Sequence, residues 1–194
     1  MASLRRLYQH YALYMRSLPI HVVVGDPSHF DAYVVNAGFT DFDGHQQKKP
    51  GLVANHSGAV AAWVFGANTV ARHARLGQLH ISHLASYEHM GMLELELRAR
   101  EPDAEISAYD EWRARWSGAE PCREHVAASD DWSTGELLAT ATVNCTWESR
   151  VSETVVYDML FNKTQAHGRC LVLVARAQQS PQGSMVNIQH ISLF

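Results

Sequence analysis

The sequence predicts an α+β domain in which a curved antiparallel sheet wraps around a long buried central helix, and three observations lead to this fold class. The segment His56–Leu76 is rich in Ala, Gly and Val, and its apolar residues cover most of a helix circumference. Basic residues before Gly77 resemble a helix C-terminus. Leu93–Arg98 alternates apolar and polar residues without fault, which is typical of a half-buried strand. Four further strand-like runs close the sequence.

The first fifty residues predict one helix, two strands and a loop. Residues 2–18 place apolar side chains at spacings of three and four, which indicates an amphipathic helix, and Pro19 stops it. Two short β-branched runs, Ile20–Val24 and Tyr33–Val35, predict strands. The polar segment Thr40–Gly51 predicts a surface loop.

The second half of the sequence predicts sheet. Gln78–Arg100 is expected to form a hairpin, and the polar segment 101–133 is expected to be an insertion that carries Trp112 and Trp116 at helical spacing. Sequential strands joined by short links predict an antiparallel meander. Its four strands are expected at Leu137–Glu148, Glu153–Phe161, Arg169–Gln178 and Val186–Phe194.

Composition and charge exclude several classes of protein. A chain of 194 residues fits one domain spanning 1–194, and the apolar and charged fractions of 46% and 19% exclude general disorder. A net charge of −4 gives no basic footprint for nucleic acid. No apolar stretch reaches the roughly 18 residues of a membrane span. No cofactor motif is found, and the spacing of the twelve histidines supports no metal site.

Cysteine usage favours a cytoplasmic location. Three cysteines are too few for a disulfide scaffold, and the odd number leaves at least one thiol free, with Cys145 expected to be buried and inert. The basic residues of the N-terminal segment leave an organellar, mitochondrial address open. Three Asn-x-Ser/Thr sequences would matter only in a secreted chain, and they begin at Asn55, Asn144 and Asn162.

Two short motifs resemble the hotdog superfamily of thioesterases and dehydratases, in which an antiparallel sheet wraps a central helix. His56-Ser-Gly-Ala-Val-Ala-Ala62 is similar to the His-Gly-Gly start of that helix in one branch. The resemblance implies that a thioester carbonyl is polarised at the helix N-terminus, near Ser57 and Gly58. Asp41-Phe-Asp-Gly-His45 is similar to the Asp-x-x-Gly-His segment of another branch. It implies that Asp41 acts as nucleophile or general base.

The resemblance also implies a substrate and an oligomeric state. An acyl-CoA or a carrier-bound acyl group would be hydrolysed or dehydrated, with His45 or His56 orienting water. Asn68 lies within an otherwise apolar stretch, and it is expected to be either a structural polar link or a substrate-facing group. Hotdog active sites usually form between two subunits, so a homo-oligomer is expected.

Two alternatives remain open at this stage. Phe65 occupies the place where one hotdog branch has an acid, so the chain could instead be a non-catalytic accessory or scaffold subunit of a larger assembly. The final four strands also resemble the cone-shaped NTF2-like fold, which would imply a small-molecule enzyme or binding protein. The accessory subunit would share the hotdog fold of the enzyme, whereas the NTF2-like alternative is distinguished from it by strand order.

Overall fold

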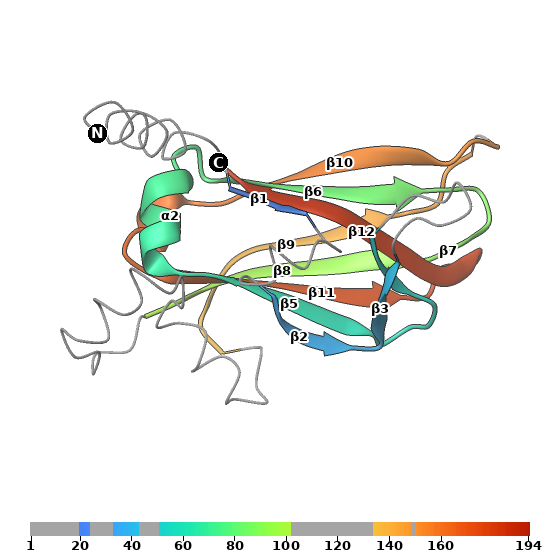
Figure 1. Ribbon diagram of the computed structural model, residues 1–194, viewed down its shortest axis with the longest axis horizontal. Helices are drawn as coiled ribbons and strands as arrows, with labels where there is room; N and C mark the ends of the chain where they lie inside the picture. Colours follow the sequence, from blue (N-terminus) through green and yellow to red (C-terminus); the bar gives the residue numbers. More distant parts are fainter. Residues whose placement is uncertain (1–19, 24–32, 43–50, 102–133, 149) are drawn as a thin grey trace, which may run out of the picture.

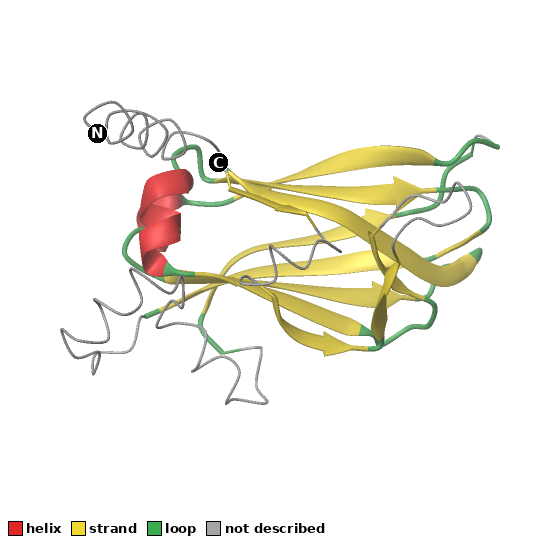
Figure 2. Ribbon diagram, viewed as in Figure 1, coloured by secondary structure: helices red, strands yellow, loops and turns green. Residues whose placement is uncertain are grey.

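The chain folds as a sandwich of two β-sheets, as the computed structural model shows for the residues that it describes (Figures 1 and 2). These residues are 20–23, 33–42, 51–101, 134–148 and 150–194. Strands provide most of the described structure, and the two helices are short. The two sheets face each other, and helix α2 lies across one end of the sandwich (Figure 2).

The larger sheet, sheet A, contains seven strands. Its main order is β10-β6-β12-β4-β3, and β1 and β7 both pair with the long strand β12. All these pairs are antiparallel except β7 with β12, which is parallel. The strands are β1 (Ile20–Val23), β3 (Phe39–Phe42), β4 (Gly51–Ala54), β6 (Gln78–Ala85), β7 (His89–Met90), β10 (Glu153–Leu160) and β12 (Gly183–Leu193).

The smaller sheet, sheet B, contains five antiparallel strands in the order β2-β5-β11-β8-β9. The strands are β2 (Tyr33–Ala37), β5 (Val60–Phe65), β8 (Met92–Arg100), β9 (Glu136–Asn144) and β11 (Cys170–Gln178). Helix α2 (Ala67–His73) connects β5 to β6 and so passes from sheet B to sheet A, and α5 (Lys163–Ala166) lies between β10 and β11. Neither helix is long enough to cross a membrane.

The core lies between the sheets. It is formed by every second side chain of each strand, because successive side chains of a strand point to opposite faces. On β8 the residues at odd positions are fully buried, and the residues at even positions point outward. Leu93, Leu95 and Leu97 therefore meet the inward side chains of sheet A, among them Ile81 and Ile191. Burial of these side chains is the main stabilising contribution, because each removes a large apolar surface from water.

The predicted central helix is wrong, and the residues responsible are in β5. Residues 60–65 form an interior strand of sheet B, between β2 and β11, with both of its faces covered. Trp63 and Phe65 face the main core, whereas Ala62 and Val64 join a second apolar cluster on the outer face with Val174. A strand that is buried on both faces loses its alternation and reads as a continuous apolar run, which resembles a buried helix.

The hotdog-like fold class is therefore wrong, and so is the NTF2-like alternative. Both folds need a long helix packed on a sheet, and the segment expected to supply it is β5 followed by the seven-residue helix α2. The predicted helix C-terminus before Gly77 is nearly correct, because α2 ends at His73 and Gly77 has a left-handed φ of 66°.

The strands expected from the sequence are found, but their pairing is not as predicted. The surface loop expected at Thr40–Gly51 is wrong at both ends, because residues 40–42 belong to β3 and Gly51 begins β4. Strands occupy the stretches expected near residues 20, 33, 78–85, 92–100 and those of the final four runs. However, β6 belongs to sheet A and β8 to sheet B, so residues 78–100 are not a hairpin. The final four strands alternate between sheets B and A instead of forming a meander. The predicted N-terminal helix 2–18 and nearly all of the 101–133 insertion lie outside the described residues.

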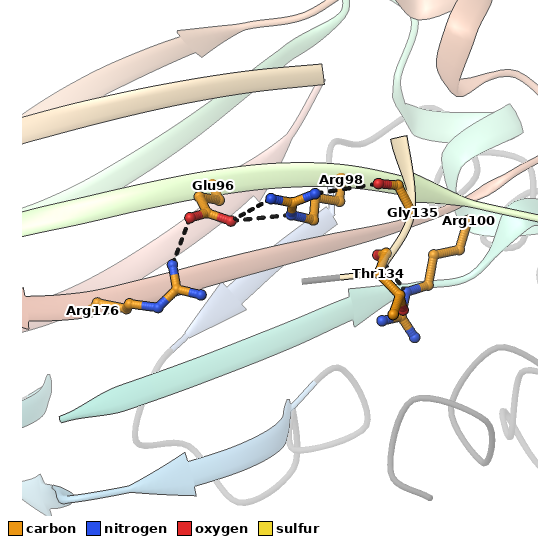
Figure 3. A network of polar contacts seen from close by, with 6 residues as sticks. All are labelled: Glu96, Arg98, Arg100, Thr134, Gly135 and Arg176. Carbon is orange, nitrogen blue, oxygen red and sulfur yellow. Dashed lines mark hydrogen bonds and ion pairs between the residues drawn. The ribbon is translucent and has the colours of Figure 1, made fainter. Parts of the chain in front are cut away.

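A network of charged side chains covers part of the outer face of sheet B (Figure 3). One carboxylate oxygen of Glu96 lies 2.7 Å from Arg176 Nη1, and the other accepts from Arg98 Nε at 3.0 Å. Arg98 also donates to the Gly135 carbonyl, and Arg100 donates to the Thr134 carbonyl. The network thus joins β8 to β11 and to the residues that precede β9.

The pKa of the Glu96 carboxyl reflects two opposing effects. Burial by itself would raise the pKa, but the hydrogen bond from Arg98 and the positive charge of Arg176 outweigh it, and the pKa is lowered. The side chains of Glu96 and Arg98 are each 17% exposed, so their attraction is less screened than that of a surface pair. The network is therefore a structural clamp between strands.

We expect Leu95→Ala to lower the free energy of unfolding by about 2–5 kcal/mol, because Leu95 is fully buried between the sheets. Leu160→Ala is the matched control, since Leu160 is 68% exposed on β10 and its loss should change stability by less than about 0.5 kcal/mol. Urea unfolding followed by tryptophan fluorescence measures both. Equal losses for the two variants would contradict the sandwich core.

We expect Glu96→Gln to lower the free energy of unfolding by about 1–3 kcal/mol at neutral pH, because it leaves two guanidinium groups without their carboxylate. Since the folded pKa is lower than the ordinary 4.5, the contribution of Glu96 is complete above that pH and is lost as pH falls through the folded pKa. The difference between the two proteins should therefore shrink in acid. Urea unfolding at a series of pH values measures it.

Glu94→Gln is the control for the charge network. Glu94 lies on the same face of β8, but its carboxylate accepts a hydrogen bond from the uncharged amide of Gln178, at 2.9 Å. It should lose less stability than Glu96→Gln at neutral pH. Equal losses would show that the arginine charges contribute nothing.

Candidate functional site

Asp41 and His56, two of the three residues that the sequence suggested as catalytic, do not lie together in the structure. The backbone of Asp41 lies in β3 opposite Leu52 of β4, and Asn68 lies in α2. His45 lies outside the described residues. His56 follows β4, four residues beyond the partner of Asp41, so the two are separated along an extended strand.

His56, Ser57 and Gly58 form an exposed turn between β4 and β5. The imidazole of His56 packs over Gly38, where an added Cβ would lie only 2.7 Å from the ring. The Gly58 amide donates to the Ala177 carbonyl and pairs with β11. No helix begins at this turn, so the dipole that would polarise a thioester carbonyl is missing.

The acyl-thioester function is therefore wrong for this chain, together with its acyl-CoA or acyl-carrier substrate. The homo-oligomer was expected only because hotdog sites form between subunits, and that reason falls with the fold. The scaffold alternative also loses its basis, because Phe65 is a core residue of β5 and not a lost catalytic acid.

Two loops at the end of the sandwich opposite α2 form the best-supported site (Figure 1). The first follows β6 and contains residues 86–88, and the second follows β9 and contains residues 145–152. The Ser86 amide donates to the Cys145 carbonyl at 3.1 Å, and the Trp147 amide donates to the Ser86 carbonyl at 2.9 Å. Ser86 and Thr146 therefore pair as a parallel bridge.

This bridge places two aromatic residues next to each other. Trp147 donates to the carbonyl that immediately precedes Tyr87, so the two residues have neighbouring backbones. Both side chains are exposed, Tyr87 by 42% and Trp147 by 39%. Each is followed by an exposed glutamate, Glu88 or Glu148. We call these four residues the aromatic site.

Buried residues hold the two loops in place. Met90 and Cys145 are fully buried in the main core, next in sequence to the exposed parts of the loops. The Met90 carbonyl accepts from the Ser180 hydroxyl at 2.6 Å, and Gly91 bonds to both neighbouring segments through its amide and its carbonyl. Ser86 Oγ lies 2.8 Å from Ser152 Oγ, which closes the second loop. The aromatic site is therefore displayed from anchored backbone.

The approach of β12 to the first loop needs a glycine. Gly183 pairs with His89, and an added Cβ at Gly183 would come within 2.3 Å of the His89 carbonyl oxygen. His89 itself adopts a left-handed φ of 59°, a conformation in which histidine is enriched. The chain can then turn sharply between the exposed Glu88 and the buried Met90.

Cys145 is a structural thiol, as the sequence predicted. It is completely buried, and burial raises its pKa to about 12. The thiol stays protonated at neutral pH and is a poor nucleophile. Its contribution is to anchor the second loop in the core.

Histidines gather on sheet A without forming a metal site. His80 Nε2 lies 3.3 Å from Asp158 Oδ1, without hydrogen-bond alignment, and His190 Nε2 lies 2.6 Å from Ser192 Oγ. His83 faces inward and is 2% exposed, and burial lowers its pKa so that it is neutral. Within the described ranges, no three His, Cys, Asp or Glu side chains converge as metal ligands.

A basic hollow of about 400 Å³ lies at the α2 end of the sandwich. Arg75, Lys163 and His167 supply its polar lining together with Thr164. Lys163 donates to the Arg75 carbonyl at 3.5 Å. Arg75, Lys163 and His167 are all exposed to solvent, so this hollow supports no specific ligand.

The four residues of the aromatic site were not among those predicted from the sequence. A signal was present, because Ser86-Tyr87-Glu88 and Thr146-Trp147-Glu148 repeat one pattern of hydroxyl, aromatic and glutamate residues. The two copies are 60 positions apart. Only the bridge between Ser86 and Thr146 shows that they are neighbours.

No family model matches the chain, and no curated protein matches it. Solved structures of similar arrangement include the CBM36-1 domain of a multidomain xylanase from the hindgut metagenome of Trinervitermes trinervoides, with 6% identity, 90% and 95% coverage of this and that chain, and a TM-score of 0.43. The mannan-recognising module TmCBM27 shows 10% identity, 91% and 96% coverage and 0.43. The xylan-binding module CBM15 shows 10% identity, coverage of 91% of this chain and 97% of that chain, and a TM-score of 0.44. Likeness at these scores establishes neither fold nor function.

We expect Gly38→Ala to cost more stability than Gly58→Ala. Both glycines have φ near 90°, so both changes introduce backbone strain of about 1–2 kcal/mol. Only the Gly38 change also meets the His56 ring, whereas nothing lies within 4 Å of a Cβ at Gly58. Adding His56→Ala to Gly38→Ala should recover the excess loss. Chemical denaturation of the wild type, Gly38→Ala, His56→Ala and the double variant measures this recovery. If the double variant recovers nothing, the packing role of His56 is contradicted.

Proposed function

We propose that this chain binds carbohydrate at the aromatic site. The observation that carries the proposal is the pair of exposed aromatic residues, Tyr87 and Trp147, each followed by an exposed glutamate on loops that hydrogen-bond to each other. Exposed aromatic side chains on anchored loops are typical of binding surfaces.

The chemistry of a sugar ring matches this arrangement. A pyranose has an apolar face of C–H groups, which packs on an aromatic ring, and a rim of hydroxyl groups, which needs acceptors and donors. Tyr87 and Trp147 supply the apolar surface, and the carboxylates of Glu88 and Glu148 accept hydrogen bonds from hydroxyls. A few polar groups beside an apolar platform orient a ligand while the platform supplies most of the affinity.

The openness of the site favours an extended ligand. Both aromatic side chains lie on the surface, and the basic hollow lies at the other end of the sandwich. A surface of this kind contacts one side of a chain molecule, such as a polysaccharide, and leaves the rest in solvent. Affinity then depends on stacking over a small area, and each aromatic ring is a large fraction of it.

We expect Trp147→Ala to weaken binding to its polysaccharide about tenfold or more, which corresponds to about 1.4 kcal/mol. Tyr87→Ala should weaken binding in the same direction. A panel of soluble neutral polysaccharides in affinity gel electrophoresis identifies the ligand, and titration calorimetry with it gives the dissociation constants.

Leu76→Ala is the matched control for this experiment. Leu76 is 71% exposed, but it lies between α2 and β6 at the opposite end of the molecule, so its removal should leave binding unchanged. Glu88→Gln and Glu148→Gln separate a neutral sugar from a cation. Gln keeps an acceptor, so sugar binding should survive in part, whereas a quaternary ammonium ligand would lose its counter-charge. Binding of tetramethylammonium with indifference to every polysaccharide would contradict the proposal.

A further inference from the structure

We propose that Asn144 and Asn162 are N-glycosylation sites and that the chain matures in the secretory pathway. Both residues begin Asn-x-Thr sequences, Asn144-Cys-Thr146 and Asn162-Lys-Thr164. Such sequences accept a glycan only where the asparagine is reachable in a secreted chain. Their geometry and a disulfide elsewhere in the chain carry the inference.

Asn144 presents its amide nitrogen to solvent. It is the last residue of β9 and is exposed. Its side-chain oxygen accepts from the Thr146 amide at 3.0 Å and from the Thr146 hydroxyl at 2.7 Å. These bonds fix the oxygen toward the chain. Within the part of the chain that the structure describes, Nδ2 of Asn144 has no hydrogen-bond partner.

Asn162 repeats this geometry at the opposite end of the sandwich. It precedes α5 and is exposed, and its side-chain oxygen accepts from the Thr164 amide at 2.9 Å. Again no described residue pairs with Nδ2. Asn55, which begins the third Asn-x-Ser/Thr sequence, is also exposed, in the β4–β5 turn. All three acceptor asparagines are therefore accessible in the folded domain.

The oxidation state of the cysteines points to the same compartment. Cys170 is disulfide-bonded, whereas Cys145 is a free, buried thiol. Disulfides form and persist in oxidising compartments and are rare in the cytosol, where thiols are kept reduced. Cys170 itself is 1% exposed within the outer apolar cluster of sheet B. The cytoplasmic location expected from the cysteine count is a prediction that competes with this one.

The modification requires a sugar donor of the polyprenyl-diphosphate class. Nδ2 of the asparagine forms a bond to C1 of the oligosaccharide, and the bond between C1 and the diphosphate oxygen breaks. The diphosphate leaves with the electron pair, and one Nδ2 proton passes to a base. No electrons are gained or lost by the protein. The product at Asn144 places a glycan three residues before Trp147, at the rim of the aromatic site.

The test is peptide mass spectrometry of the protein purified from the cells that make it, before and after treatment with peptide N-glycosidase. We expect the peptides containing Asn144 and Asn162 to carry glycan before treatment and to show conversion of asparagine to aspartate after it. Unmodified asparagine at both positions before treatment would overturn the proposal. Alkylation of the unfolded, unreduced protein should label Cys145 and spare Cys170; labelling of Cys170 would also overturn it.

Paired variants separate the sequence requirement from folding. In a secreting eukaryotic host, Thr146→Ala and Thr164→Ala should each remove one glycan and shift gel mobility by one step. Thr146→Ser and Thr164→Ser keep the hydroxyl and should keep the glycan, so they are the matched controls. An unchanged mobility in both alanine variants would contradict the assignment. These readouts do not depend on carbohydrate binding, so the outcome is independent of the proposed function.

Discussion

The packing of two sheets against each other is the constraint on which the rest of the molecule depends. The inward leucines of β8 and the inward residues of β5 and β11 meet Ile81 of β6 and Ile191 of β12, and each of these sides needs the other to exclude water. Neither sheet could bury its apolar face alone. Helix α2 lies across one end of the sandwich that this contact creates, and the two loops of the aromatic site emerge at the other end (Figures 1 and 2).

The same core positions the aromatic site. Met90 and Cys145 are buried between the sheets. They anchor the two loops that lie at the surface at this end of the sandwich. Hydrogen bonds between Ser86 and the second loop then bring Tyr87 and Trp147 together. Because the loops are already anchored, they lose little conformational entropy when a ligand binds. This favours binding at a site where the ligand buries only a small area.

One of the two proposed glycosylation sites, Asn144, lies at the same end of the molecule as the aromatic site. A glycan at Asn144 would extend from the last residue of β9, next to the loop that carries Trp147. A carbohydrate ligand at the aromatic site would share this rim, so glycosylation there would limit the directions from which a polysaccharide can approach. The outer face of sheet B has a different role, because Glu96 bonds to Arg98 and Arg176 there and ties strands together.

Local pattern determined many of the strands of this protein, and tertiary structure decided how they assemble. The alternation in β8 and the β-branched runs of β10, β11 and β12 identify strands because one side chain in two faces the core. Periodicity says nothing about whether the motifs at Asp41 and His56 form one site, and the structure places these two residues apart. The nature of β5 could not be read either, since a strand covered on both faces has no period. Sheet membership and the pairing of Ser86 with Thr146 depend on contacts between distant residues, and a local sequence pattern does not reveal which distant residues meet.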